Sequence, residues 1–214
     1  MTARNIFIFL FIAFNSFFNQ AFTQSLGIIY EASSFSLQDF YYSEYSNPTG
    51  LIKNLFLNYN APLNESFILS FRAGYGWNRY EYSYYDGKEI HETNTDGIPL
   101  ETEIKYLHKI GKDSLFEPIL GIGLGYYYYN SINKSSSSSF EHKFISRGLA
   151  QYLTFGLNIN VTENISSSIQ FKKNMANWIS TKYTEGNDIM EKDYAQGNGL
   201  DDLSISLGIF FKVY

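Results

Sequence analysis

The chain of 214 residues has no cysteine, only 4 prolines and only 3 histidines, and charged residues make up just 17% of it. Without cysteine it has no disulfides and no thiolate metal sites, although such a protein can still work in an oxidising compartment. The histidines are too scattered for a metal site. A net charge of -5 without any Lys/Arg cluster argues against nucleic acid. We therefore expect no cofactor, no metal and no nucleic-acid partner.

Long apolar runs are also missing beyond the N-terminus. There, Arg4 precedes the apolar stretch Ile6–Phe14, and Ala21–Thr23 offers small residues for cleavage. This order predicts a secretory signal peptide over residues 1–23. The alternative is a membrane anchor, but polar residues interrupt the stretch short of the ~20 apolar residues that a spanning helix needs.

The remaining residues, 24–214, form one predicted domain. Aromatic residues make up 19% of the chain, with 19 Tyr and 19 Phe, and this favours β-strands. Apolar and polar residues alternate with a period of two, which is typical of strands with one buried face. Eight segments show this alternation: Leu26–Phe35, Gly50–Asn60, Ser66–Tyr82, Pro99–Lys109, Leu115–Asn130, Ser146–Val161, Ile165–Ile179 and Leu200–Tyr214.

The stretch Pro118–Tyr129 shows the two faces most clearly. Leu120, Ile122 and Leu124 continue into tyrosines on one face, whereas the other face is mostly glycine. A soluble sandwich would bury the apolar face as a core. A membrane barrel would turn it to lipid and need small residues in a crowded lumen.

The connections between the eight segments alternate in length. Three short turns occupy Ala61–Glu65, Ile110–Asp113 and Thr162–Asn164. The four long, polar loops cover Ser36–Thr49, Ser83–Ile98, Ser131–Ile145 with its serine run, and Ser180–Gly199. Short periplasmic turns and long outer loops are typical of outer-membrane barrels. The sequence thus predicts an all-β, eight-stranded antiparallel up-and-down transmembrane β-barrel with both termini on the periplasmic side.

The polar face carries few charges, and the two signs are nearly balanced. Buried charges are tolerated only when they are paired, so these side chains suit a closed lumen. We expect Arg72 to pair with Glu101 and Glu103 on the adjacent strand. The predicted structural ion-pair network consists of Arg72, Glu101, Glu103, Lys105 and Lys172, with Glu31 and Lys212 on the same face.

The apolar face ends in aromatic residues on both sides, as expected at the two bilayer interfaces. Lys53, Gln151 and Lys173 also fall on this face. They lie toward the loop ends, where a charge costs only ~0–1 kcal/mol. The predicted girdle residues are Tyr59, Tyr75, Trp77, Tyr106, Tyr126 and Tyr128, with Phe67 and Trp178 as further members.

The signal peptide, the eight strands and the motifs Gly121–Tyr126 and Leu207–Tyr214 resemble the small bacterial outer-membrane β-barrel family, which includes the membrane domain of outer-membrane protein A. The resemblance covers about Leu26–Tyr214. It implies the outer membrane as location, and outer-membrane lipid, lipopolysaccharide and the barrel-assembly machinery as partners. It also implies a monomer with a structural or surface-interaction role, and a surface ligand would bind through the loops.

Three other functions compete with this interpretation. A lipid- or lipopolysaccharide-modifying enzyme would need loop histidines, and His91 and His142 each lie beside a glutamate. A soluble lipocalin-like barrel would bind a ligand inside an apolar lumen. A conducting pore is the third, but eight strands leave a lumen that side chains fill, so any conductance should be small. We expect no catalysis.

Overall fold

The computed structural model describes residues 24–33, 52–84, 89–109, 114–136, 141–185, 188–195 and 203–213. The signal-peptide prediction and the loop 36–49 lie outside these ranges. Among the residues described, no helix is long and apolar enough to cross a membrane. The described strands are β1 (Gln24–Ser33), β2 (Ile52–Pro62), β3 (Phe67–Tyr84), β4 (Glu89–Leu107), β5 (Phe116–Ser135), β6 (Glu141–Asn160), β7 (Ile165–Glu185), β8 (Asp188–Ala195) and β9 (Leu203–Val213).

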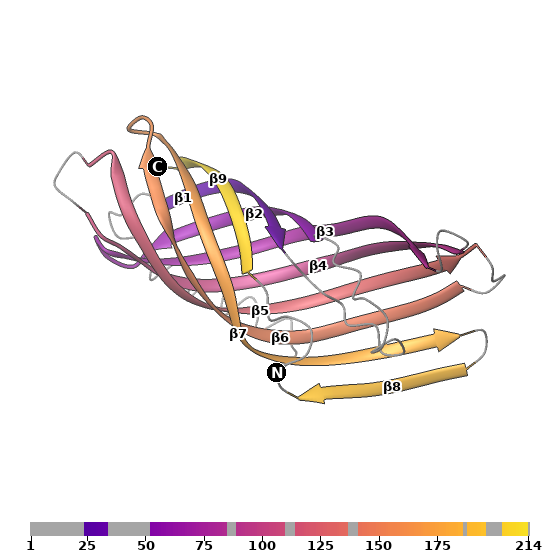
Figure 1. Cartoon of the computed structure of the whole chain (residues 1–214). Coiled ribbons are helices and arrows are strands. Elements are labelled where there is room, and N and C mark those ends of the chain that lie inside the picture. Colours follow the sequence, from indigo (N-terminus) through magenta and orange to yellow (C-terminus); the bar gives the residue numbers. More distant parts are fainter. Residues whose placement is uncertain are drawn as a thin grey trace.

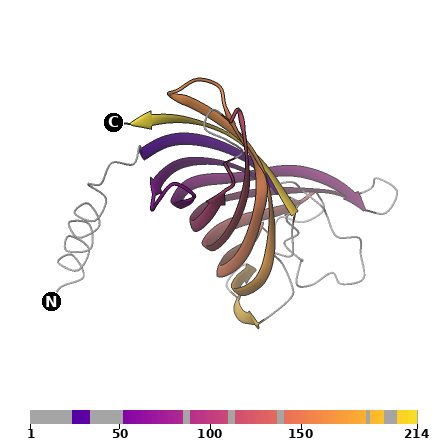
Figure 2. The same ribbon diagram turned by 90° about the vertical axis from the view of Figure 1, so that its left-hand side faces the viewer.

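Eight of these strands close an antiparallel barrel (Figure 1). Strands β1 to β7 pair consecutively, and β9 closes the ring by pairing with both β7 and β1. The register sets Gln24 at the start of β1 opposite Val213 at the end of β9, and Figure 2 shows these two ends of the barrel chain side by side. Both ends therefore lie at the rim of the short turns. The predicted eight-stranded up-and-down barrel is confirmed.

The loop predictions were partly wrong, because three of the four long polar segments contain strand. Strand β4 already begins at Glu89, β5 and β6 pair out to Lys134 and Glu141, and β7 runs to Glu185. Strand β8 pairs only with β7 among the described strands and stands outside the ring. Figure 1 shows these extensions reaching well past the ends of β1 and β2. The alternation of apolar and polar residues did not predict these extensions, because it indicates burial of one face and not backbone pairing.

One irregularity changes the phase of β7. Gln151 pairs with Ala176, but the next residue, Tyr152, pairs with Asn174, so Met175 is an extra residue in β7. Such a β-bulge reverses which face later residues occupy. Trp178, a predicted girdle residue, lies beyond it and pairs through its backbone with Leu149, while its side chain is outside the described part.

Burial alternates along the strands as the sequence predicted. In β2, every second residue from Ile52 to Asn60 is buried, and the residues between them are half-buried or exposed. The buried positions face the lumen, whose centre contains charged and amide side chains as well as aromatic rings. This is the reverse of a lipocalin, so the lipocalin-like alternative is wrong.

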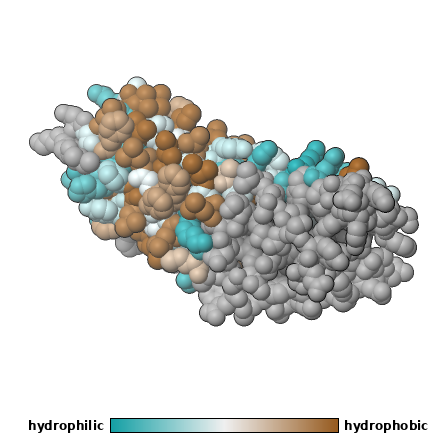
Figure 3. Space-filling view, viewed as in Figure 1, coloured by the Kyte–Doolittle hydropathy of each residue, from teal (hydrophilic) through white to brown (hydrophobic). Residues whose placement is uncertain are grey.

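The outer wall is apolar. Leu57 is 64% exposed and Leu124 53%, and most leucines and isoleucines of the barrel wall are exposed in the same way. Figure 3 shows hydrophobic residues gathered in a band over the barrel, with hydrophilic residues beyond it. Leaving a leucine side chain in water forgoes ~1.5–3 kcal/mol of burial free energy. A wall of this composition therefore needs an apolar surrounding.

Candidate functional site

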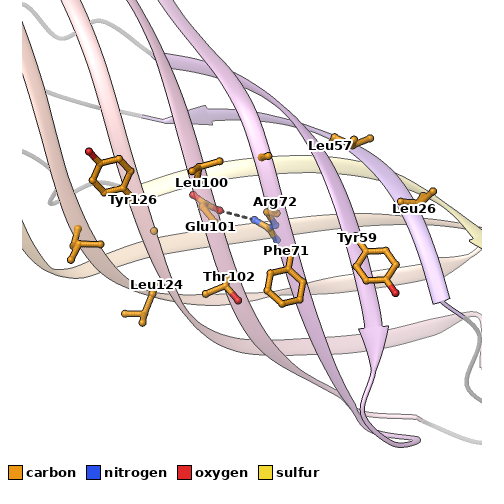
Figure 4. A pocket seen from close by; sticks show the side chains of 13 residues that line it. Leu26, Leu57, Tyr59, Phe71, Arg72, Leu100, Glu101, Thr102, Leu124 and Tyr126 are labelled. Carbon is orange, nitrogen blue, oxygen red and sulfur yellow. Dashed lines mark hydrogen bonds and ion pairs between the residues drawn. The ribbon is translucent and has the colours of Figure 1, made fainter. Parts of the chain in front are cut away.

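The centre of the lumen is a layer of buried ion pairs. Arg72 on β3 pairs through its two terminal nitrogens with Glu101 at 3.4 Å and Glu103 at 3.0 Å, both on β4. The register places Arg72 directly opposite Glu101. The three side chains are almost completely buried. In Figure 4 a dashed line joins Arg72 to Glu101 between the two strands.

Lys172 on β7 joins this layer from the far side of the barrel. Its ammonium donates to Glu101 at 2.6 Å and to Glu31 of β1 at 2.7 Å. It also lies within 6 Å of the ring centres of three aromatic residues, Phe56, Tyr127 and Tyr152. Such contacts with ring faces stabilise a desolvated cation.

All five predicted network residues thus lie in one connected set, because Lys105 contacts Glu103 at 3.6 Å. Three carboxylates face three cations once Glu31 is included, so the buried charges balance. Lys212, the seventh charged residue of the predicted lumen face, lies at the exposed end of β9. A balanced and hydrogen-bonded set is the condition under which buried charges are tolerated.

Several members of the network carry no charge, and sequence reasoning missed them. Arg72 donates to Gln170 at 2.7 Å and to Asn58 at 3.3 Å. The hydroxyl of Tyr127 donates to Glu101 at 2.6 Å, and that of Thr154 donates to Glu103. The alternation places these residues on the lumen face. The alternation does not give the position of each residue along the barrel axis, and this position decides which side chains it contacts across the lumen.

Aromatic rings close the lumen around the charges. Tyr152 and Phe56 are among the largest fully buried side chains, and Phe210 is 4% exposed. Glycines make the space for them: a Cβ on Gly123 would lie 2.3 Å from the ring of Tyr152, and one on Gly27 would lie 2.3 Å from the ring of Phe210. The glycine-rich face of the strands is therefore a packing partner of the large rings.

A small cavity lies beside Lys172 on the side of the long strand extensions. Its volume is about 10 Å³. Three polar atoms among its lining residues have no hydrogen-bond partner in the described structure: Glu31 Oε2, Asn174 Oδ1 and Ser204 Oγ. A polar cavity of this size suits at most a single water molecule.

The predicted girdle residues lie on the outer wall in two groups. Toward the turns, Tyr106 packs against Phe67 with ring centres 5.4 Å apart, and Tyr59 is half-buried nearby on β2. Toward the strand extensions, Tyr75 stacks on Trp77 at 6.1 Å. The exposed Tyr126 and Tyr128 belong to this second group on β5.

Between the two aromatic groups the outer wall is hollowed. The hollow has a volume of about 550 Å³ and an almost wholly apolar lining. Small residues, Ala73 and Thr102, lie on neighbouring strands among larger ones such as Phe71, Leu100 and Leu124. Figure 4 shows these side chains spread over the wall. The surface is uneven and apolar, so flexible hydrocarbon chains could fill it.

The histidines of the enzyme alternative lie on different strands. His91 pairs through its backbone with Ser135, and His142 pairs with Asn133, so β5 separates β4 from β6 at this height. Both residues belong to strands and not to loops, which corrects the prediction. Their side chains are outside the described part. Among the described residues, no group of His, Asp and Glu is arranged to hold a metal ion.

No protein-family model matches the chain, and no curated protein matches it. Many solved structures share its arrangement of strands, and two of them illustrate the likeness. Outer membrane protein OprG from Pseudomonas aeruginosa aligns with a TM-score of 0.53 and 16% identity, over 90% of this chain and 95% of that one. The fold is that of the small outer-membrane β-barrels. A major outer membrane protein from Thermus thermophilus aligns with a TM-score of 0.52 and 12% identity, over 89% of this chain and 99% of that one.

Proposed function

We propose that the protein is a bacterial outer-membrane β-barrel with a structural or surface-interaction role and no catalytic activity. The observation that carries this proposal is the apolar outer wall around a lumen whose centre is filled by charged and aromatic side chains. Hydrocarbon would cover the wall, and lipopolysaccharide and other membrane lipids would surround the barrel. The barrel-assembly machinery would insert it, and one chain closes the ring, so a monomer suffices.

The filled lumen favours a scaffold over a channel. Tyr152, Phe56 and the layer around Arg72 occupy its centre, and an eight-stranded barrel has little room beyond its side chains. The ion pairs would then serve to hold the strands together. The two groups of tyrosines and Trp77 would anchor the barrel at the two bilayer interfaces.

The long strand extensions supply the surface for interaction. Strands β3 to β7 continue past the end of β1 at Ser33, and β8 adds a further strand to β7. These polar segments would stand outside the bilayer and present any binding surface there. Binding in barrels generally belongs to such rim segments, while the wall supplies rigidity.

Location and orientation can be tested together. We expect an epitope inserted between residues 186 and 187 to be accessible to antibody on intact cells. The same epitope inserted in the turn at Glu163–Asn164 should be accessible only after the outer membrane is permeabilised. The tagged protein should fractionate with the outer membrane and migrate faster on a gel before boiling than after it. Recovery in the soluble fraction, or the reverse pattern of accessibility, would refute the proposal.

The enzyme alternative gains no support from the site. A nucleophile and its base must lie within hydrogen-bond reach of each other. The backbones of His91 and His142 lie on β4 and β6 with β5 between them, so each histidine would need its own nucleophile, and the described residues show none paired with either. Substituting both histidines should leave the lipid A composition of the cells unchanged if the scaffold role is correct.

A further inference from the structure

The turn end of the lumen contains a second cavity, which the scaffold role does not use. Its volume is about 600 Å³, within the range of small-molecule sites. The turn between β6 and β7 lines its mouth with Thr162 and Glu163, whereas Lys105, Gln170 and Phe210 lie at its inner end. The ion-pair layer around Arg72 closes the inner end of the cavity, since Gln170, which lines this end, accepts a hydrogen bond from Arg72. We call this cavity the vestibule.

Lys105 is an unusual cation at the inner end of the vestibule. Its side chain is only 4% exposed. Its contact with Glu103 is 3.6 Å long, beyond hydrogen-bond distance, and Glu103 already accepts from Arg72 and Thr154. Glu103 is the ion-pair partner of Lys105 among the described residues. An ammonium has three donors, so this single long contact leaves room for a further acceptor.

The carboxylates that line the vestibule do not contact the Lys105 ammonium. Glu117, the half-buried carboxylate nearest along β5, receives a hydrogen bond from Asn158 at 2.9 Å. Glu65 and Glu163 lie in the turns, at the mouth of the vestibule. Gly121 lies directly across from Lys105 on β5 and has no side chain to fill the space. None of these carboxylates pairs with Lys105 in the described structure.

The walls near Lys105 are partly apolar. Ile119 and Phe210 line the vestibule and are almost completely buried, and Ile68 pairs with Lys105 in the register of β3 and β4. Ser168 adds a hydroxyl, which accepts from Gln170 at 3.0 Å and keeps its own proton free to donate. The inner end thus combines one cation, a hydroxyl donor and apolar walls.

We propose that the vestibule binds a small organic anion, with a carboxylate or phosphate oxygen on the Lys105 ammonium and a short apolar body against Ile119 and Phe210. The ligand enters from the turn side, because the ion-pair layer blocks the opposite end. This site is independent of the structural role of the barrel: it needs only the described lumen, whichever way the barrel lies in a membrane.

The test uses the full mature chain, refolded in uncharged detergent micelles, with butyrate and inorganic phosphate as probes. Backbone amide shifts of residues 105, 119 and 168 are followed by NMR during titration. We expect saturable shifts with at least one probe. Butyrate alone would identify a carboxylate with an apolar body, phosphate alone a compact oxyanion, and either result supports the site.

Variants then identify the binding group. Lys105→Gln should weaken binding by roughly tenfold or more, because a hydrogen bond to a charged partner is lost. Lys105→Arg should retain binding. The matched control is Lys109→Gln, which removes an exposed cation at the mouth of the same vestibule and should change affinity little. Ser166→Trp, which leaves the network intact and fills the vestibule, should abolish binding even if Lys105→Gln fails to fold.

Three results would overturn the proposal. The first is the absence of saturable shifts with both probes. The second is unchanged affinity in Lys105→Gln or in Ser166→Trp. The third is an equal loss in Lys105→Gln and Lys109→Gln, which would show attraction by general charge and not by a defined site.

Discussion

Replacing Arg72 with methionine is expected to destabilise the folded barrel by roughly 3–5 kcal/mol, because breaking a buried pair leaves uncompensated charges in the lumen. Glu103 would keep only the Thr154 hydroxyl and the longer contact with Lys105. Gln170 would lose its 2.7 Å bond to the guanidinium. Urea titration in lipid vesicles, with the gel shift on boiling as the measure of folding, gives the free energy of unfolding.

The matched control for Arg72→Met is Lys53→Met. Lys53 carries the same charge but is exposed on the outer wall, where β2 runs beside Trp77. We expect its replacement to change the free energy of unfolding by no more than about 1 kcal/mol. Adding Glu103→Gln to Arg72→Met should restore part of the loss, since it removes the excess negative charge that Arg72→Met leaves in the lumen. Similar effects of the two single substitutions would show that the lumen pairs do not stabilise the barrel.

Gly123→Leu is the second change with a large expected effect: it should prevent most of the protein from reaching the heat-shiftable folded form. A side chain at this position would meet the ring of Tyr152, whose carbon Cζ lies 2.3 Å from the added Cβ. Tyr152 is 0% exposed and cannot turn away into solvent. Overpacking of this kind typically costs ~1–3 kcal/mol and sometimes more. The measurement is the folded fraction after refolding into vesicles.

Leu124→Ile, one residue further along β5, is the control for Gly123→Leu. Leu124 is exposed on the outer wall, so an isomeric side chain should change stability by less than ~1.5 kcal/mol. Combining Gly123→Leu with Tyr152→Ala should restore folding, because the deleted ring vacates the space. If both single changes are tolerated equally well, the faces of the strand are assigned the wrong way round.

The barrel fold, and the division of its strands into a lumen face and an outer face, could be predicted from the sequence. Alternation in segments such as Leu203–Val213 depends on one-sided burial, which a barrel imposes on every strand. The pair of Arg72 with Glu101 could also be predicted, because the third and fourth segments are joined in a hairpin. A charge on an otherwise small and polar face needs a partner, and the next strand is the nearest place to find one.

The strand extensions could not be predicted in this way. Segments such as Glu89–Gly97 have polar residues on both faces, so they carry no alternation that marks them as strand. Strand β8 was missed for the same reason. The bulge at Met175 was missed because it appears only in the register with β6, where Gln151 pairs with Ala176 and Tyr152 with Asn174.

Contacts across the lumen, between strands that are not neighbours, could not be predicted from the sequence either. Gln170 of β7 reaches Arg72 of β3, and Lys172 reaches Glu31 of β1, although neither pair lies on neighbouring strands. Such contacts depend on how far each strand is displaced along its neighbour around the whole ring. Local patterns fix the face of a residue but not this displacement, so the sequence named charged members of the network without their uncharged partners.

The absence of cysteine allows the central claim, an apolar wall toward lipid and a polar lumen within, to be tested with Leu207→Cys and Ser206→Cys on β9. Leu207 is exposed on the wall, whereas its neighbour Ser206 is buried in the lumen. In vesicles, we predict that a nitroxide on residue 207 collides with lipid-soluble oxygen far more than with a water-soluble nickel chelate. The cysteine at 206 should react with thiol reagents only after unfolding. Preferential collision of the residue 207 label with the nickel chelate, or ready labelling at 206 in the folded protein, would contradict the account.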